Sequence, residues 1–166
     1  MVNQSKSRSS VVGQYGEAFV AQWLEQQGWS ILARGWTSRW GELDVVALQQ
    51  KGTRSPSCLA FVEVKTRSRG NWDEDGLLAI TPQKQAKLWK TARLFLAKHP
   101  HLAEVPCRFD VALVTVREFP NSQLQALKTL INHESQAPIA LREPFTLDRY
   151  QLTLHTYLES AFELSD

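Results

Sequence analysis

Cysteine is scarce in this 166-residue chain, which argues against a small disulfide-rich domain and against a small zinc-stabilised domain. Cys58 and Cys107 stand far apart, and no histidine lies at ligand spacing from either, so neither a disulfide framework nor a zinc motif is expected. No apolar run approaches the roughly 20 residues of a membrane helix. The polar segment Met1–Ser10 lacks the apolar core of a signal peptide, and we therefore expect a cytoplasmic protein without a membrane span.

A glycine-rich phosphate loop is also absent, so dependence on ATP is not expected. Charge of either sign is not in large excess, with 19 Lys and Arg against 17 Asp and Glu. The basic residues nevertheless concentrate between positions 34 and 93, which suits a polyanionic partner. A hydrophobic content of 43% is enough for one domain with a real core. We expect a flexible lead over 1–10 and a single domain over 11–166.

The hydrophobic pattern predicts an α/β fold with a mixed sheet flanked by helices. Gly28 is a natural stop for the first helix, and Thr81-Pro82 offers an N-cap and a first-turn proline for the second. The expected helices cover 12–27, 82–98 and 124–133, and the expected strands cover 30–36, 43–48, 59–66, 108–116 and 151–155. Residues 67–76 are expected to form a polar loop.

Two charged strings in adjacent strands are the most informative part of the chain. The turn chemistry of residues 49–57 lies midway between Asp44 and Glu63, so a hairpin there places the two carboxylates opposite each other. Strand side chains alternate, so Lys65 shares the face of Glu63 at about 6.6 Å. Both strands are otherwise apolar on both faces, where charges are costly unless they are paired or hold a metal. A catalytic site is favoured, and a buried structural ion pair is the alternative.

Glu17 supplies a third carboxylate. On a helical wheel it lies within about 60° of Gly13, Val20, Ala21 and Leu24, inside an apolar stripe. The alternative is a glutamate at the rim of that stripe. Asp110, near the start of the strand over 108–116, is interpreted as a cap, as a partner for a nearby arginine, or as a group that supports the site.

Five motifs in order resemble the YraN-like family of uncharacterised bacterial proteins. They are Gly13–Ala18, Arg34–Asp44, Phe61–Arg67, Thr81–Ala92 and Arg108–Val111. The resemblance implies a restriction-endonuclease-like core of the PD-(D/E)XK type, similar to archaeal Holliday junction resolvases. Leu43-Asp44 stands where the superfamily name has Pro-Asp. Residues 119–149 exceed the connection expected of the family and are interpreted as an insertion in the C-terminal half.

The resemblance implies a metal-dependent endonuclease that hydrolyses phosphodiester bonds in DNA, with branched or otherwise structured DNA among the candidate substrates. Its expected ligands for Mg²⁺ or Mn²⁺ are Asp44, Glu63 and the carbonyl of Val64. The expected catalytic residues are Glu17, Asp44, Glu63 and Lys65, and the expected nucleic-acid contacts are Arg39, Arg67, Lys84 and Lys87. Trp40 is expected either to stack or to pack, and a homodimer is left open.

Two alternatives to the enzyme remain at this point. One is a nucleic-acid-binding module on a nuclease fold without turnover. The other is a protein-interaction scaffold that uses the insertion as its contact surface.

Overall fold

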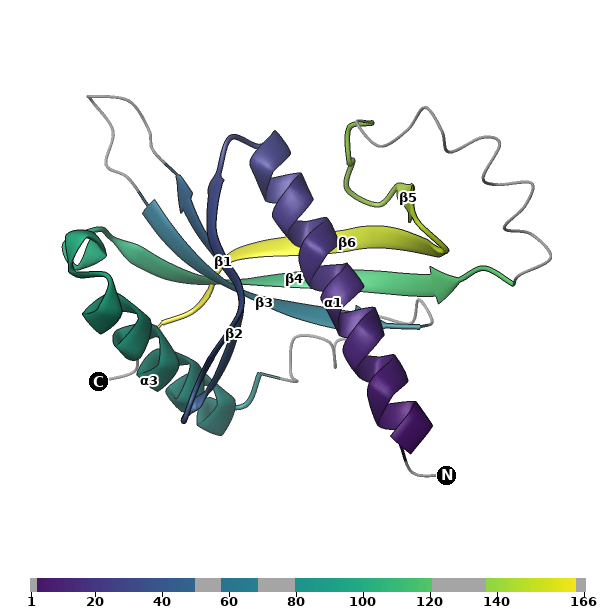
Figure 1. Cartoon of the computed structure of the whole chain (residues 1–166). Coiled ribbons are helices and arrows are strands. Elements are labelled where there is room, and N and C mark those ends of the chain that lie inside the picture. Colours follow the sequence, from purple (N-terminus) through teal and green to yellow (C-terminus); the bar gives the residue numbers. More distant parts are fainter. Residues whose placement is uncertain (1–2, 50–57, 69–79, 121–136, 164–166) are drawn as a thin grey trace.

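A single six-stranded sheet with helices on both faces organises the chain. The computed structural model describes residues 3–49, 58–68, 80–120 and 137–163, and of residues 3–10 the backbone alone. Its elements are α1 (Asn3–Gln26), β1 (Ser30–Ser38), β2 (Gly41–Gln49), β3 (Cys58–Arg67), α3 (Pro82–Lys98), the 3₁₀ turn η1 (Pro100–Leu102), β4 (Cys107–Glu118), β5 (Pro144–Leu147) and β6 (Tyr150–Phe162). The strand order is β1-β2-β3-β4-β6-β5. The β3–β4 pair is parallel and the other pairs are antiparallel, so the sheet is mixed (Figure 1).

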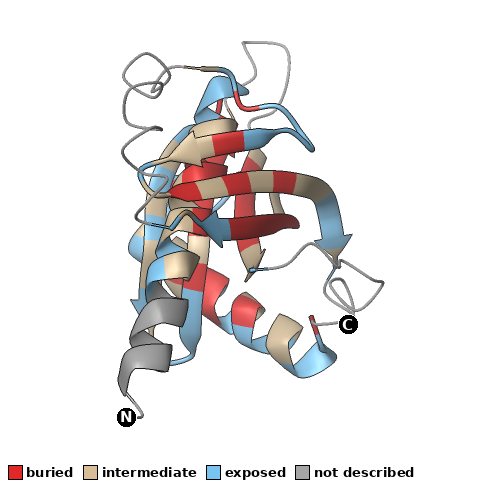
Figure 2. Ribbon diagram, turned by 90° about the vertical axis from the view of Figure 1, so that its right-hand side faces the viewer, coloured by how far each residue is buried: buried red, intermediate tan, exposed pale blue. Residues whose placement is uncertain are grey.

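The central strands are buried on both faces because a helix covers each. Along β2, Val45 and Ala47 join the core beneath α1, whereas Val46 and Leu48 join the core beneath α3. Buried residues accordingly gather along the strands and on the inner sides of the helices (Figure 2). This double cover explains the continuous apolar runs of the sequence, and it makes a charged side chain in β2 or β3 costly unless it has partners.

The predicted α/β fold with a mixed sheet is confirmed, and so is the predicted start of α3. Thr81 caps that helix by accepting a hydrogen bond from the backbone N–H of Lys84 at 3.3 Å, and Pro82 begins it. The start of α1 was predicted wrongly. The helix begins at Asn3 because no proline or glycine interrupts the chain before Gly13, so most of the expected lead over 1–10 is helical.

The C-terminal strand is longer than predicted. Strand β6 runs from Tyr150 to Phe162, well past the alternation that ends at His155. Its register against β4 shifts between Phe109 and Val111 and again between Leu113 and Val114. Each irregularity interrupts the two-residue period on which the sequence prediction rested.

The expected insertion over 119–149 contributes part of the sheet. Strand β5 pairs along the edge of β6, and Ile139 and Phe145 are buried in the core beneath α1. The predicted helix over 124–133 lies outside the described residues, as does most of the predicted loop over 67–76. Within the described parts of the chain, neither α1 nor α3 has the length and apolar content needed to cross a membrane.

Candidate carboxylate–lysine site

The β2–β3 hairpin has the register that the sequence predicted. Val45 lies opposite Val62 and Gln49 opposite Cys58, so the next position along places Asp44 opposite Glu63. The paired ladder ends at Val45 and Val62, while β3 remains paired with β4 as far as Arg67. Pairing between strands β2 and β3 therefore stops just where the two carboxylates stand.

Asp44 uses a backbone group that this end of pairing leaves available. The N–H of Val64 donates to Asp44 Oδ2 at 2.8 Å, so the aspartate takes a bond that a neighbouring strand would otherwise accept. Asp44 and Glu63 line the same cavity, of about 430 Å³, and so lie on one side of the sheet as predicted.

Glu63 is the most deeply buried carboxylate of the pair, with 5% of its surface exposed. Its Oε1 accepts a hydrogen bond from the ammonium of Lys65 at 2.8 Å, which confirms that the two side chains share a face. The same oxygen also accepts from the ammonium of Lys84. One carboxylate oxygen is thus shared by two cations.

Lys84 was expected as a nucleic-acid contact, which stays a prediction, and its contact with Glu63 was not expected. Lys84 lies in the first turn of α3, whose capping residue Thr81 lines the cavity of Asp44 and Glu63. Its side chain therefore points into the site. Lys87, one turn later, is exposed and lines the same cavity, which suits its predicted contact with a phosphate.

The electrostatics of the site are dominated by burial and by like charges. Burial, and then the neighbouring Glu63, raise the pKa of Asp44 to about 7, although the N–H of Val64 and the ammonium of Lys84 oppose the shift. Burial also works against the charged form of Lys84, but its contacts with Glu63 raise its pKa overall. Burial and the neighbouring Glu63 therefore outweigh the two contacts that favour the charged form of Asp44.

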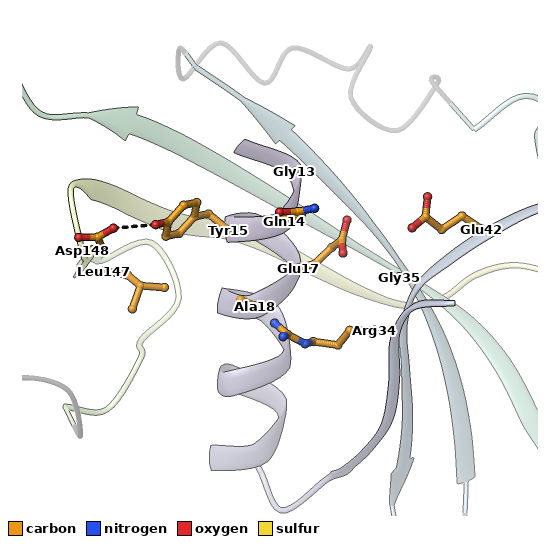
Figure 3. A pocket seen from close by; sticks show the side chains of 10 residues that line it. All are labelled: Gly13, Gln14, Tyr15, Glu17, Ala18, Arg34, Gly35, Glu42, Leu147 and Asp148. Atoms are coloured by element: carbon orange, nitrogen blue, oxygen red, sulfur yellow. Dashed lines mark hydrogen bonds between the residues drawn. The ribbon is translucent and has the colours of Figure 1, made fainter. Parts of the chain in front are cut away.

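Glu17 approaches the carboxylates from α1, on the other face of the sheet. It lines a second cavity, of about 780 Å³, together with Arg34 and Glu42 (Figure 3). Burial, and then Glu42, raise the pKa of Glu17, whereas Arg34 lowers it. Glu17 also contributes to the raised pKa of Asp44, so the two acids lie within electrostatic reach. Glu17 is brought near the pair without sharing its cavity.

Glu42 was not predicted as a site residue, and it lines both cavities. Glu17 and Glu42 crowd around Gly35, which has φ of +55°. A Cβ atom at Gly35 would lie 3.1 Å from Glu42 Oε1 and 3.7 Å from Glu17 Oε2, so glycine leaves room for both carboxylates. The available signal was its position within the string Gly41-Glu42-Leu43-Asp44.

The rim of the smaller cavity carries an exposed aromatic ring with two cations near it. Trp40, 42% exposed, lines that cavity. The guanidinium of Arg39 lies 5.1 Å and the ammonium of Lys90 4.8 Å from its ring centroids. The predicted contact residue Arg67 lies near the end of β3 and is not among the residues that line either cavity.

The donor set at the site suits a hard divalent cation but is not a finished metal cage. Asp44 and Glu63 offer carboxylate oxygens, the ligands that Mg²⁺ and Mn²⁺ prefer. Within the described residues, no three His, Cys, Asp or Glu side chains are grouped so as to hold a metal ion. The carbonyl of Val64 as a ligand stays a prediction. The ammonium groups of Lys65 and Lys84 contact Glu63 Oε1, where a bound cation would otherwise lie.

Asp110 belongs to a separate network that holds β4 against β6. It is fully buried, and it accepts hydrogen bonds from Arg108 Nε at 3.1 Å, Tyr157 OH at 2.7 Å and the N–H of Ser160 at 2.9 Å. The interpretation of Asp110 as an arginine partner is confirmed.

The fold and the site together define a three-layer α/β protein with a buried carboxylate–lysine cluster where two strands of its sheet stop pairing. The chain belongs to the uncharacterised protein family UPF0102, the YraN-like family, whose model matches residues 16–114. That match includes Glu17, Asp44, Glu63 and Lys65.

Curated relatives extend the match over nearly the whole chain. A UPF0102 protein of Acaryochloris marina is 50% identical over 163 residues, which cover 96% of this chain and 94% of the relative. Another, of Trichodesmium erythraeum, is 47% identical over 171 residues and 95% of each chain. A third, of Trichormus variabilis, is 47% identical over 152 residues, 92% of this chain and 94% of the relative.

Proposed function

We propose that this protein is a divalent-metal-dependent endonuclease that hydrolyses phosphodiester bonds in DNA, built on a restriction-endonuclease-like core. One observation carries the proposal. The carboxylates of Asp44 and Glu63 face one cavity, and the ammonium of Lys65 lies 2.8 Å from Glu63 Oε1. Two acids and a lysine, placed where β2 and β3 stop pairing, can together bind a cation, a water and a phosphate.

Each side chain has a role that follows from its place. Asp44 and Glu63 hold Mg²⁺ or Mn²⁺, and Glu17 and Glu42 add negative charge from the adjoining cavity. The cation, when bound, lowers the pKa of a water and offsets charge on the phosphate oxygens. Lys65 orients or deprotonates the attacking water, or stabilises the charge of the transition state.

The rim supports nucleic acid as the substrate. Lys87 and Lys90 offer charge to the phosphate backbone, and Trp40 is 42% exposed, so its ring can stack on an unpaired base when a neighbouring cation turns to a phosphate. Branched DNA contains unpaired or unstacked bases at its junctions, so it suits this rim better than a regular duplex does.

A second candidate is a nucleic-acid-binding module without turnover. The observation that favours it is the contact of Lys84 with Glu63, because an ammonium already occupies a position that a catalytic cation needs. In that case the lysines and Trp40 bind DNA, and the carboxylates only order the lysines.

A cleavage assay separates the two candidates. Linear, single-stranded, flapped and four-way DNA are incubated with the protein and Mg²⁺ or Mn²⁺, beside Glu63→Gln and the surface control Glu104→Gln. We expect cleavage of at least one substrate by the wild type and by Glu104→Gln, and none by Glu63→Gln. DNA binding without cleavage under every condition would favour the binding module.

A further inference from the structure

We propose that Lys84 is an internal counterion that occupies the cation position of Glu63 in the metal-free protein and moves to the substrate phosphate when a divalent cation binds. The inference rests on the proposed function and adds a residue, and a regulation of metal binding, to that site. Its starting point is the shared oxygen, because Glu63 Oε1 accepts from both Lys65 and Lys84.

Three cations cannot all be accommodated at that oxygen. A divalent ion bound to Glu63 would lie against two ammonium groups, and like charges at such distances repel strongly in a partly buried site. One lysine must therefore give way when the metal binds. Contact of Lys84 with Glu63 and contact of the metal with Glu63 are then competing events.

Lys84 is the lysine that is free to move. The side chain of Lys65 is 23% exposed and projects from β3 two residues after Glu63, so it is held beside the carboxylate. The side chain of Lys84 is 40% exposed and reaches the same oxygen from α3, across the cavity. Rotation about its side-chain bonds takes the ammonium from Glu63 into the cavity without any movement of the backbone.

The position of Lys84 in the first turn of α3 explains why its ammonium needs an anion nearby. The first turn of a helix carries positive potential, and acidic residues are the ones that stabilise it. This helix has no acid in its first turn and has Lys84 instead. That arrangement is unfavourable by itself, and it becomes favourable when an anion sits nearby. In the metal-free protein the anion is Glu63, and in the loaded protein it is the phosphate to be cleaved.

Metal binding in the absence of DNA gives the first test. Titration calorimetry with Mn²⁺ compares the wild type with Lys84→Met, with Lys84→Gln as a second variant, and with Lys98→Met as a control in the last turn of α3, away from the cavity. Removal of the competing ammonium should tighten Mn²⁺ binding on the order of tenfold, the size of a typical coupling between two sites. Lys98→Met should bind Mn²⁺ like the wild type.

DNA binding gives the second test. On uncleavable phosphorothioate DNA, Lys84→Met should weaken binding when Mg²⁺ saturates the site and should leave it unchanged without Mg²⁺, when Glu63 holds the lysine. A variant that binds Mn²⁺ no more tightly than the wild type would overturn the inference while leaving the proposed nuclease intact. If no form binds Mn²⁺ and none cleaves DNA, the proposed function fails as well.

Discussion

The raised pKa of Asp44 predicts an unusual dependence of stability on pH. Its ordinary value is 3.8, and burial together with Glu63 raises it to about 7 in the folded protein. Between these two values the folded state holds a proton that the unfolded state has released. The free energy of unfolding therefore falls as pH rises from about 4 to about 7, and it stays low above that range.

The size of the effect follows from the same two values. The shift is about 3 pKa units, and each unit corresponds to about 1.36 kcal/mol. The full figure, about 4 kcal/mol, is an upper limit because Asp44 interacts with neighbouring charged groups. We expect a loss on the order of 2–4 kcal/mol across the window.

The perturbation that isolates this effect is Asp44→Asn. Asparagine keeps an oxygen that can accept from the N–H of Val64 but has no charge to bury. Urea unfolding with a chelator present, in steps from pH 4.5 to pH 8, gives the free energy of unfolding of each protein. The difference between variant and wild type should grow in favour of the variant as pH rises, and titrating groups far from Asp44 cancel in that difference.

Two controls sharpen the experiment. Glu104→Gln removes an exposed carboxylate, and its profile should run parallel to that of the wild type. Added Mg²⁺ should recover stability of the wild type above pH 7 but not of Asp44→Asn, because a cation that binds the folded carboxylate stabilises it by mass action. Parallel profiles for Asp44→Asn and the wild type would refute the claim that burial of this carboxylate is costly.

Two further predictions concern the packing and the rim of the site. A Cβ atom at Gly16 would lie 2.2 Å from Thr66 Cγ2, so Gly16→Ala should push α1 away from β3 and lower the free energy of unfolding by about 1–3 kcal/mol in thermal or urea unfolding. Thr66→Ser, which removes that methyl group, should partly restore stability. Gly13→Ala is the control, because a Cβ atom there meets open space, and it should be neutral or slightly stabilising. Trp40→Ala should weaken binding of single-stranded DNA by about 1–3 kcal/mol in fluorescence anisotropy, and an equal loss on blunt duplex DNA would argue against base stacking.

The hairpin at the centre of the site could be predicted because its geometry is local. Turn residues lie midway between Asp44 and Glu63, and strand alternation then fixes which side chains share a face. Both steps hold in the structure, where Val45 lies opposite Val62. The first residue of α3 could be predicted for the same reason, because the capping residue Thr81 and the first-turn proline act only on their immediate neighbours.

What the sequence missed depends on contacts between distant segments. The start of α3 could be predicted, but nothing in its sequence places the first turn against β3, and so Lys84 was expected to contact nucleic acid and not Glu63. The length of β6 was missed because its irregular register against β4 breaks the alternation after His155. Glu42 precedes the buried part of β2, so its place two residues before Asp44 was a weak signal, and the two cavities that it lines identify it as a site residue.

The end of pairing between β2 and β3 explains why charged residues of α1, of the sheet and of α3 come close to one another. Within a continuous ladder, side chains from opposite faces of a sheet are kept apart by the backbone. Here the ladder ends at Val45 and Val62, and Glu17 from α1 and Lys84 from α3 both reach the gap electrostatically. The freed N–H of Val64 fixes Asp44 at the edge of that gap. A substitution that extended the β2–β3 pairing would therefore dismantle the site without altering any of its charged residues.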